Sequence, residues 1–205
     1  MPRPKQDPQI RINEILDAAD ALFHKRGYHK TMIGDIVKKV GVAHGTFYYY
    51  FKSKEEIVEA MIDRHLSKFK SKIETMVAAQ DTPLEHKLES LANIMFDTIR
   101  YKNGLLLEFL YNDQYLYLKD KVFRQGKRLL ATHMFNLVEE GKRNGTFKVQ
   151  SPKAAVNLIL AILQCHIESI YNRESPKELA QQIALAKRLA ENALGLREGI
   201  LHIGA

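Results

Sequence analysis

The sequence predicts an all-α protein in which a small helical N-terminal head is joined to a larger helical body. Four expected helix starts share a side-chain oxygen followed by proline, a pair that is typical of helix N-termini. They are Asp7-Pro8, Thr82-Pro83, Ser151-Pro152 and Ser175-Pro176. Apolar residues recur every three or four positions, and no segment alternates apolar and polar residues as a half-buried strand does. We therefore expect about nine helices and no sheet.

The composition is that of a chain with a sizeable core and no covalent cross-links. Its 205 residues can bury such a core, and Cys165, the single cysteine, cannot form an internal disulfide. No Cys or His spacing is typical of a zinc site. The N-terminus lacks the apolar stretch of a signal peptide, and no uninterrupted apolar run approaches the ~18 residues of a spanning helix. We expect a cytoplasmic protein with no cofactor, no metal and no membrane contact.

Three short helices are expected in the head, over residues 8–26, 31–40 and 43–50. The first places its apolar side chains on one stripe, as a helix with one buried face does. Gly41 separates the second helix from the third, and glycine readily adopts the left-handed conformation that ends a helix. The short connection predicts a compact three-helix unit.

A long fourth helix is expected over residues 53–77, beginning at Ser53 with a glutamate three positions later, which is the spacing of a capping box. It is long enough to leave the head and enter the body, so we expect it to link the two mechanically. Asn103-Gly104 is expected to end a later helix. The remaining helices are expected at residues 83–101, 105–111, 118–143, 152–172 and 176–194. The domains are then residues 8–54 and residues 55–205.

Positive charge is concentrated in the head. The formal net charge is +7, of which residues 1–54 carry +5 and the remaining 151 residues carry +2. Lys and Arg side chains that meet phosphates release condensed counterions, so this asymmetry favours a polyanionic partner for the head. An ordinary solvated basic surface is the alternative that charge alone leaves open.

Residues 31–54 have the pattern of a helix-turn-helix, TMIGDIVKKVGVAHGTFYYYFKSK. In such a unit one helix lies against the DNA backbone, and the next places its N-terminal residues at base edges in the major groove. The small residues Ala43, Gly45 and Thr46 would let this second helix approach DNA closely. Phe47 and Phe51 are four positions apart, so we expect them to anchor the rear of the helix in the head.

This pattern resembles the tetracycline-repressor (TetR) family of regulators over about residues 8–61. The matching positions are Gly27-Tyr28, Thr31, Asp35-Ile36, Gly41-Val42, Gly45-Thr46, Tyr48, Tyr50-Phe51 and Lys54. Further along, the chain resembles the family in its helical layout and in the turn within residues 139–152. Ala43 and Met32 depart from the family, in which a serine and a small hydroxyl residue are common at these two positions.

The resemblance implies a transcriptional regulator that binds a palindromic double-stranded operator as a homodimer and is released by a small-molecule effector. Repression is favoured over activation because most members of the family repress. The implied DNA-binding residues are Thr31, His44, Gly45, Thr46, Tyr48, Tyr49 and Lys54. The two at helix starts, Thr31 and Lys54, are expected on phosphates, and the tyrosines along the backbone. The three residues that begin at His44 are expected at base edges.

Simpler interpretations compete for several of these residues. Tyr50 is expected in the core of the head, because a run of tyrosines is more often mixed packing than recognition. His44 is as consistent with an ordinary exposed side chain as with a base contact. Lys38 and Lys39 are expected to be solvated helix surface.

The last two helices carry more apolar residues than a surface helix pair needs. We expect them to form a four-helix dimer interface, where the resemblance also places dimerisation. Its expected residues are Leu158, Ile159, Ile162, Leu163, Ile183, Ala186, Leu189, Ala190 and Ala193. A two-fold dimer would present its recognition helices to half-sites ~34–36 Å apart or a multiple of that, hence the palindromic operator. The alternative is that both helices are core of the monomer.

The resemblance also implies an effector pocket among the fourth to eighth helices. Candidate lining residues are Met95, Phe96, Phe109, Tyr111, Phe135 and His166. Aromatic and Met residues at helical spacing are more often core than ligand contacts, and a hydrogen-bonded core histidine is the competing interpretation of His166.

Two other classes of protein compete with a regulator. An all-helical enzyme would need a catalytic constellation, yet the chain has no Gly-x-Ser-x-Gly, no phosphate-binding glycine loop and no His-Glu-x-x-His. An architectural DNA-binding protein without an effector would not need the large separate body. We therefore expect no catalytic residues.

Overall fold

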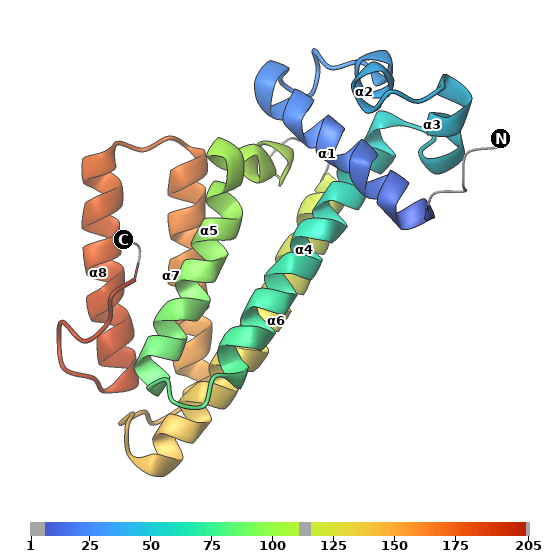
Figure 1. Cartoon of the computed structure of the whole chain (residues 1–205). Coiled ribbons are helices and arrows are strands. Elements are labelled where there is room, and N and C mark those ends of the chain that lie inside the picture. The colour runs from blue at the N-terminus through green and yellow to red at the C-terminus, as the bar shows by residue number, and fades with distance from the viewer. Residues whose placement is uncertain (1–6, 111–115, 204–205) are drawn as a thin grey trace. The chain divides into compact units, whose positions relative to one another are not determined.

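The computed structural model describes the backbone of residues 7–110 and 116–203, and within them the side chains up to residue 100 and from residue 118 onward. This part of the chain contains eight α-helices and no strand (Figure 1). The chain divides into two compact units, Met1–His65 and Leu66–Ala205. The expected all-α fold is confirmed.

The first unit contains α1 (Pro8–Arg26), α2 (Ile33–Val40), α3 (His44–Tyr50) and the beginning of α4 (Lys54–Ala78). α1 and α4 begin where the sequence predicts, because local side chains satisfy their first N–H groups. α2 begins at Ile33 instead of Thr31, and neither α2 nor α3 has a side-chain cap. The Asp7 carboxylate accepts the Gln9 N–H at 2.8 Å, and the Ser53 hydroxyl accepts the Glu56 N–H at 3.2 Å. The core of this unit comprises Ile15, Leu16, Ala19, Leu22, Phe23, Ile36, Val37, Phe47, Phe51, Ile57, Val58, Met61 and Ile62.

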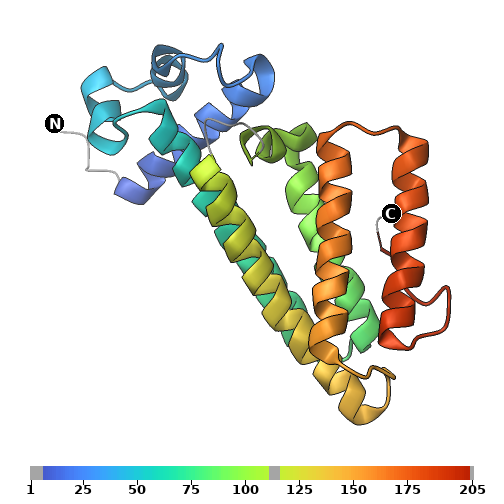
Figure 2. The same ribbon diagram turned by 180° about the vertical axis from the view of Figure 1, so that it is seen from behind.

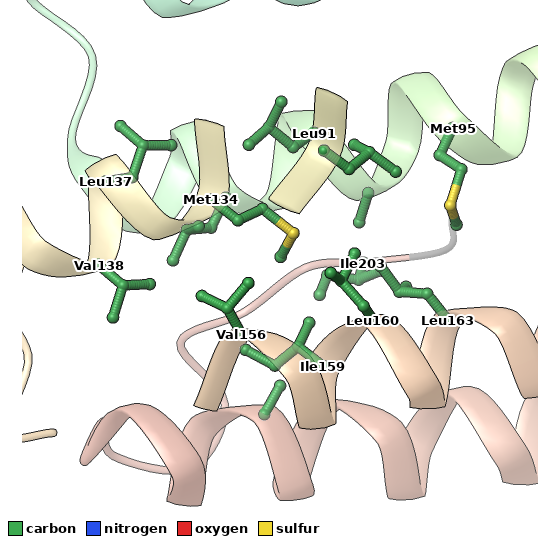
Figure 3. Packing of buried hydrophobic residues seen from close by; sticks show 14 of the residues in the cluster. Leu91, Met95, Met134, Leu137, Val138, Val156, Ile159, Leu160, Leu163 and Ile203 are labelled. Atoms are coloured by element: carbon green, nitrogen blue, oxygen red, sulfur yellow. The ribbon is translucent and has the colours of Figure 1, made fainter. Parts of the chain in front are cut away.

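The second unit is a helical bundle of the end of α4 with α5 (Leu84–Leu110), α6 (Leu116–Asn144), α7 (Pro152–Tyr171) and α8 (Pro176–Leu194). α5 packs on α6 and α7, α6 also packs on α7, and α7 packs on α8 (Figures 1 and 2). Their inward faces form one continuous core (Figure 3). The residues labelled there are Leu91, Met95, Met134, Leu137, Val138, Val156, Ile159, Leu160, Leu163 and Ile203. The last of these comes from the segment after α8.

The expected helix stop at Asn103-Gly104 is wrong. α5 continues through these residues to Leu110, so two expected helices are one helix. A glycine inside a helix costs only about 1 kcal/mol relative to alanine, which the hydrogen bonds and packing of a continuous helix offset.

The segment after α8 turns back along that helix and is held by buried groups (Figure 1). The Leu201 N–H donates to Glu191 Oε1 at 2.8 Å, and the His202 N–H donates to Glu89 Oε1 at 2.8 Å. Leu201 and Ile203 are buried in the core. The segment is therefore a structural part of the second unit.

α7 is the most apolar helix of the described residues. It has 20 residues, and an 18-residue window within it has a mean hydropathy of 1.4. By length and composition alone it could cross a membrane, and it is the single such helix among the described residues. Its buried face packs against α5, α6 and α8. These contacts are those of the central helix of a folded bundle.

Candidate functional site

The helix-turn-helix is closed by the left-handed conformation of Gly41. Its φ of +75° and ψ of +35° end α2, and its N–H donates to the Val37 carbonyl at 3.0 Å. The Val42 N–H bonds to the same carbonyl at 3.3 Å. Residues other than glycine rarely adopt this backbone conformation, so Gly41 allows the tight turn that leads into α3.

α3 separates exposed residues from buried ones on its two sides. Phe47 is fully buried and Phe51, just after the helix, is 6 % exposed. Their ring centroids are 6.3 Å apart, so the predicted anchoring of the helix in the head is confirmed. The opposite side exposes His44, Gly45, Thr46, Tyr48 and Tyr49. Tyr50 is half-buried.

Thr31 does not lie where the sequence predicts. Its exposed fraction is 0 %, and its hydroxyl donates to the Gly27 carbonyl at 2.9 Å. The expected contact between this hydroxyl and a phosphate is therefore wrong for this conformation, because the side chain has no route to solvent. Its role here is to brace the connection between α1 and α2.

Lys54 is turned toward the same connection. Its Nζ donates to the carbonyls of Tyr28, at 2.9 Å, and of Thr31, at 3.0 Å, and lies 4.0 Å from the Tyr28 ring centroid. Burial lowers the pKa of Lys54 below its ordinary value, and the neighbouring Glu55 carboxylate opposes this shift. An ammonium has three N–H donors, so one remains for another acceptor.

Glu55 completes this arrangement at the start of α4. It accepts the Tyr28 hydroxyl hydrogen at 2.9 Å. The pKa of Glu55 is lowered first by its backbone hydrogen bond and then by the hydrogen bonds from Tyr28 and Ser53. Tyr28 therefore connects the end of α1 to both charged residues at the start of α4.

The structure adds surface residues that the sequence analysis did not select as candidates. Lys30 and Lys52 are exposed close in sequence to α2 and α3, and so are Lys38 and Lys39, which agrees with their expected solvation. Met32 stands just before α2 and is 74 % exposed. Its N–H is satisfied by the Asp35 carboxylate at 3.0 Å. Hydroxyl or carboxylate residues are preferred at a helix cap, so an apolar residue at this position is the sequence feature that could have identified Met32 as a surface candidate.

A cavity of about 730 Å³ lies in the second unit, lined by parts of α5, α7, α8 and the segment after α8. Of the predicted pocket residues whose side chains are described, His166 lines it. Met95 and Phe96 are buried in the core and Phe135 is 37 % exposed, and none of the three lines this cavity. The Phe109 side chain and Tyr111 lie outside the described residues. Arg100 and Lys187, which line the cavity, were not predicted, because sequence spacing does not bring α5 and α8 together.

The comparisons with known proteins agree with this geometry. Residues 15–61 match the family model for bacterial regulatory proteins of the tetR family. Over 167 residues the chain is 26 % identical to the HTH-type transcriptional repressor KstR2 of Mycolicibacterium smegmatis, covering 80 % of this chain and 78 % of that protein. These matches support a transcriptional regulator of the TetR family.

Solved structures of regulators share the fold along nearly the whole chain. A TetR transcription regulator from Haloarcula marismortui is 20 % identical and superposes with a TM-score of 0.74, covering 90 % of this chain and 98 % of that one. The fatty acid degradation regulator FadR of Bacillus halodurans is 26 % identical with a TM-score of 0.63, over 94 % and 98 % of the two chains. The family model, the curated relatives and these structures together support a DNA-binding transcriptional regulator, and the TetR family is not a class of enzymes.

The residues predicted for a TetR-type dimer interface divide into three groups. Ile159, Leu163 and Ala190 are buried against the core of their own protomer, so for these the alternative interpretation applies. Leu158 is 50 % exposed and Leu189 is 41 % exposed. The others, Ile162, Ile183, Ala186 and Ala193, are partly buried. The exposed Leu185 lies one turn before Leu189 on the same side of α8. This i, i+4 spacing could have identified Leu185 as a further interface residue from the sequence.

Proposed function

We propose that the protein is a cytoplasmic repressor, without catalytic activity, that binds a palindromic operator as a homodimer and is released by a small-molecule effector. The observation that carries DNA recognition is the division of α3 between buried Phe47 and an exposed side with small residues at its start. A helix whose buried side is anchored in the head and whose exposed side begins with small residues can enter the major groove without disturbing the head.

The DNA contacts are proposed for the exposed residues of this surface. His44, Gly45 and Thr46 face base edges and set specificity, whereas Tyr48 and Tyr49 lie along the backbone. The remaining N–H of Lys54 donates to a phosphate, at the N-terminus of α4, where the helix dipole favours an anion. These backbone contacts hold the register of the protein on DNA, and the base contacts discriminate between sequences.

The proposed dimer forms through the exposed apolar sides of α7 and α8. Leu158 on α7, with Leu185 and Leu189 on α8, presents apolar surface that water covers in the isolated chain. The same three side chains from a second copy provide the complementary apolar surface about a two-fold axis. Two recognition helices in such a dimer read two half-sites on one face of DNA.

An effector acts through the body by stabilising one of two forms of the dimer. It shifts the equilibrium only to the extent that it binds the two forms with different affinities. α4 is continuous from the first unit into the second, so a change around its C-terminal part can alter the spacing of the recognition helices. The cavity beside α8 is the proposed effector site.

Operator binding is tested by fluorescence anisotropy with the promoter region of the protein's own gene and a scrambled duplex of equal length, at two salt concentrations. We expect tighter binding to the promoter, with an affinity that falls steeply as salt rises. A Thr46→Ala/Tyr48→Ala variant should lose the preference, and Asn136→Ala, which is exposed on α6, should retain it. Equal and weak binding to both duplexes, together with no site in a genomic selection, would contradict the proposal.

A further inference from the structure

The cavity of the second unit has apolar walls and charged residues of both signs. Its apolar lining residues are Leu179, Ala180, Ile183 and Ala184 of α8, together with Leu201 of the segment after α8. The charged lining residues are Arg100 on α5, Lys187, Arg188 and Glu191 on α8, and Glu198 in the segment after α8. The Glu191 carboxylate is already bonded to the Leu201 N–H. The three cations and two anions nearly balance, which favours an uncharged occupant.

His166 and Glu191 are the buried polar residues among those that line this cavity, and Glu191 is already engaged. His166 is 3 % exposed, and its ring stacks edge-on against Phe96 with centroids 5.2 Å apart. Its Nδ1 lies 3.4 Å from Gln182 Oε1. Gln182 in turn donates from its amide nitrogen to Glu174 Oε2 at 2.7 Å.

These contacts determine the tautomer of His166. A carboxylate oxygen only accepts, so the Gln182 amide nitrogen faces Glu174 and its carbonyl oxygen faces the imidazole. A carbonyl oxygen also only accepts, so Nδ1 carries the hydrogen and donates it to Gln182. In a neutral imidazole Nε2 is then a hydrogen-bond acceptor.

The imidazole is held in this neutral form. Burial, the largest effect, lowers the pKa of His166 below its ordinary value. The Gln182 hydrogen bond and the Glu174 charge oppose this shift, and the positive charge of Arg100 adds to it. Within the described residues, Nε2 is buried and has no hydrogen-bond partner. A buried acceptor without a hydrogen bond destabilises the protein, and a hydrogen-bond donor on a bound molecule can remove this cost.

We propose that this cavity binds an uncharged, mainly apolar molecule that carries a hydroxyl group, and that the hydroxyl donates a hydrogen bond to His166 Nε2. The apolar part lies against Leu179, Ile183 and Leu201. A ligand without a donor leaves Nε2 unsatisfied. A carboxylate presents only acceptors to an atom that is itself an acceptor. The inference rests on the proposed function only in taking this cavity as the effector site.

The test is isothermal titration calorimetry of the full-length protein with three probes of similar shape: para-phenylphenol, its methyl ether and the biphenyl carboxylate. We expect the phenol to bind at least about tenfold more tightly than the ether or the carboxylate, because only the phenol satisfies Nε2. His166→Phe keeps a ring against Phe96 and should remove this preference. Asn136→Ala is the control that should keep the preference.

A second variant tests the tautomer itself. Gln182→Leu removes the acceptor that fixes the hydrogen on Nδ1, so the phenol-to-ether preference should fall, and NMR of the imidazole nitrogens should report mixed tautomers. Equal affinities for phenol and ether, tighter binding of the carboxylate, or an Nε2 that carries the hydrogen in the wild-type protein would each overturn the inference. The titration contains no DNA. Phenol binding without operator release would leave the ligand class standing and contradict the regulatory role of the cavity.

Discussion

Gly45 lies on the exposed side of the recognition helix, where a Cβ atom would meet no protein atom within 4 Å. Nothing within the protein therefore requires glycine at this position, and alanine is the better helix former by about 0.5–1 kcal/mol. Close approach to DNA is the reason that remains. We predict that Gly45→Ala raises the free energy of unfolding by about that amount and lowers operator affinity about tenfold.

The two effects of Gly45→Ala are measured separately, by urea unfolding and by anisotropy. Gly126→Ala is the matched control, because Gly126 is also within a helix and has open space around its Cα. It should give a similar gain in stability with unchanged operator affinity. Unchanged affinity in Gly45→Ala would show that the backbone of α3 does not approach the bases at this point.

Thr31 and Thr46 have opposite surroundings in the same motif. Thr31 is fully buried with its hydroxyl bonded to Gly27, whereas Thr46 is exposed. We predict that Thr31→Val lowers the free energy of unfolding by about 1 kcal/mol through the lost hydrogen bond, with less than a threefold change in operator affinity. Thr46→Val should leave the free energy of unfolding nearly unchanged and lower the operator affinity by more than threefold. A large affinity loss in a fully folded Thr31→Val variant would restore the phosphate contact that the sequence predicts.

At the scale of helices, local chemistry explains what the sequence could predict. Asp7, Ser151 and Ser175 each accept an N–H of the first turn, so α1, α7 and α8 begin where their caps indicate. The exposed side of α3 was predictable for a similar reason, because two Phe residues four positions apart mark its buried side. These features depend on residues within a few positions of one another.

The remaining features depend on contacts between distant residues. The inward direction of Lys54 is set by the carbonyls of Tyr28 and Thr31, which the sequence does not place next to it. The cavity combines Arg100 with residues of α8 that follow about 80 positions later. The i, i+3 and i, i+4 patterns predict which side of a helix is apolar, but not whether a neighbouring helix or a second copy covers it.

The connection between α6 and α7 depends on one close contact. A Cβ atom on Gly141 would lie 2.1 Å from Cδ2 of Phe147, whose ring is buried, and the Phe147 N–H donates to the Gly141 carbonyl at 2.9 Å. We predict that Gly141→Ala lowers the free energy of unfolding by about 1–3 kcal/mol, because the ring must move within a packed core. Gly126→Ala, on the same helix, should not be destabilising. Equal stabilities of the two variants in urea unfolding would contradict this packing.

For the whole molecule, the exposed apolar side of α7 and α8 is the feature that a single chain does not explain. Leu158 and Leu189 are each about half exposed although a polar residue at either position would leave the core of the protomer intact. A charge at these positions costs little in the monomer and much in an interface that excludes water. We predict that Leu158→Glu/Leu189→Glu is a folded monomer by sedimentation, while Asn136→Glu stays dimeric.

The monomeric variant also separates dimerisation from DNA recognition. Each head retains its recognition helix, so the variant should still bind a single half-site weakly. It should lose the gain in affinity that a palindrome gives, because two linked heads bind the second half-site at a high effective concentration. Anisotropy with duplexes containing one and two half-sites measures this difference. A variant that is monomeric yet keeps the full preference for the palindrome would place the dimer contact at the operator itself rather than on α7 and α8.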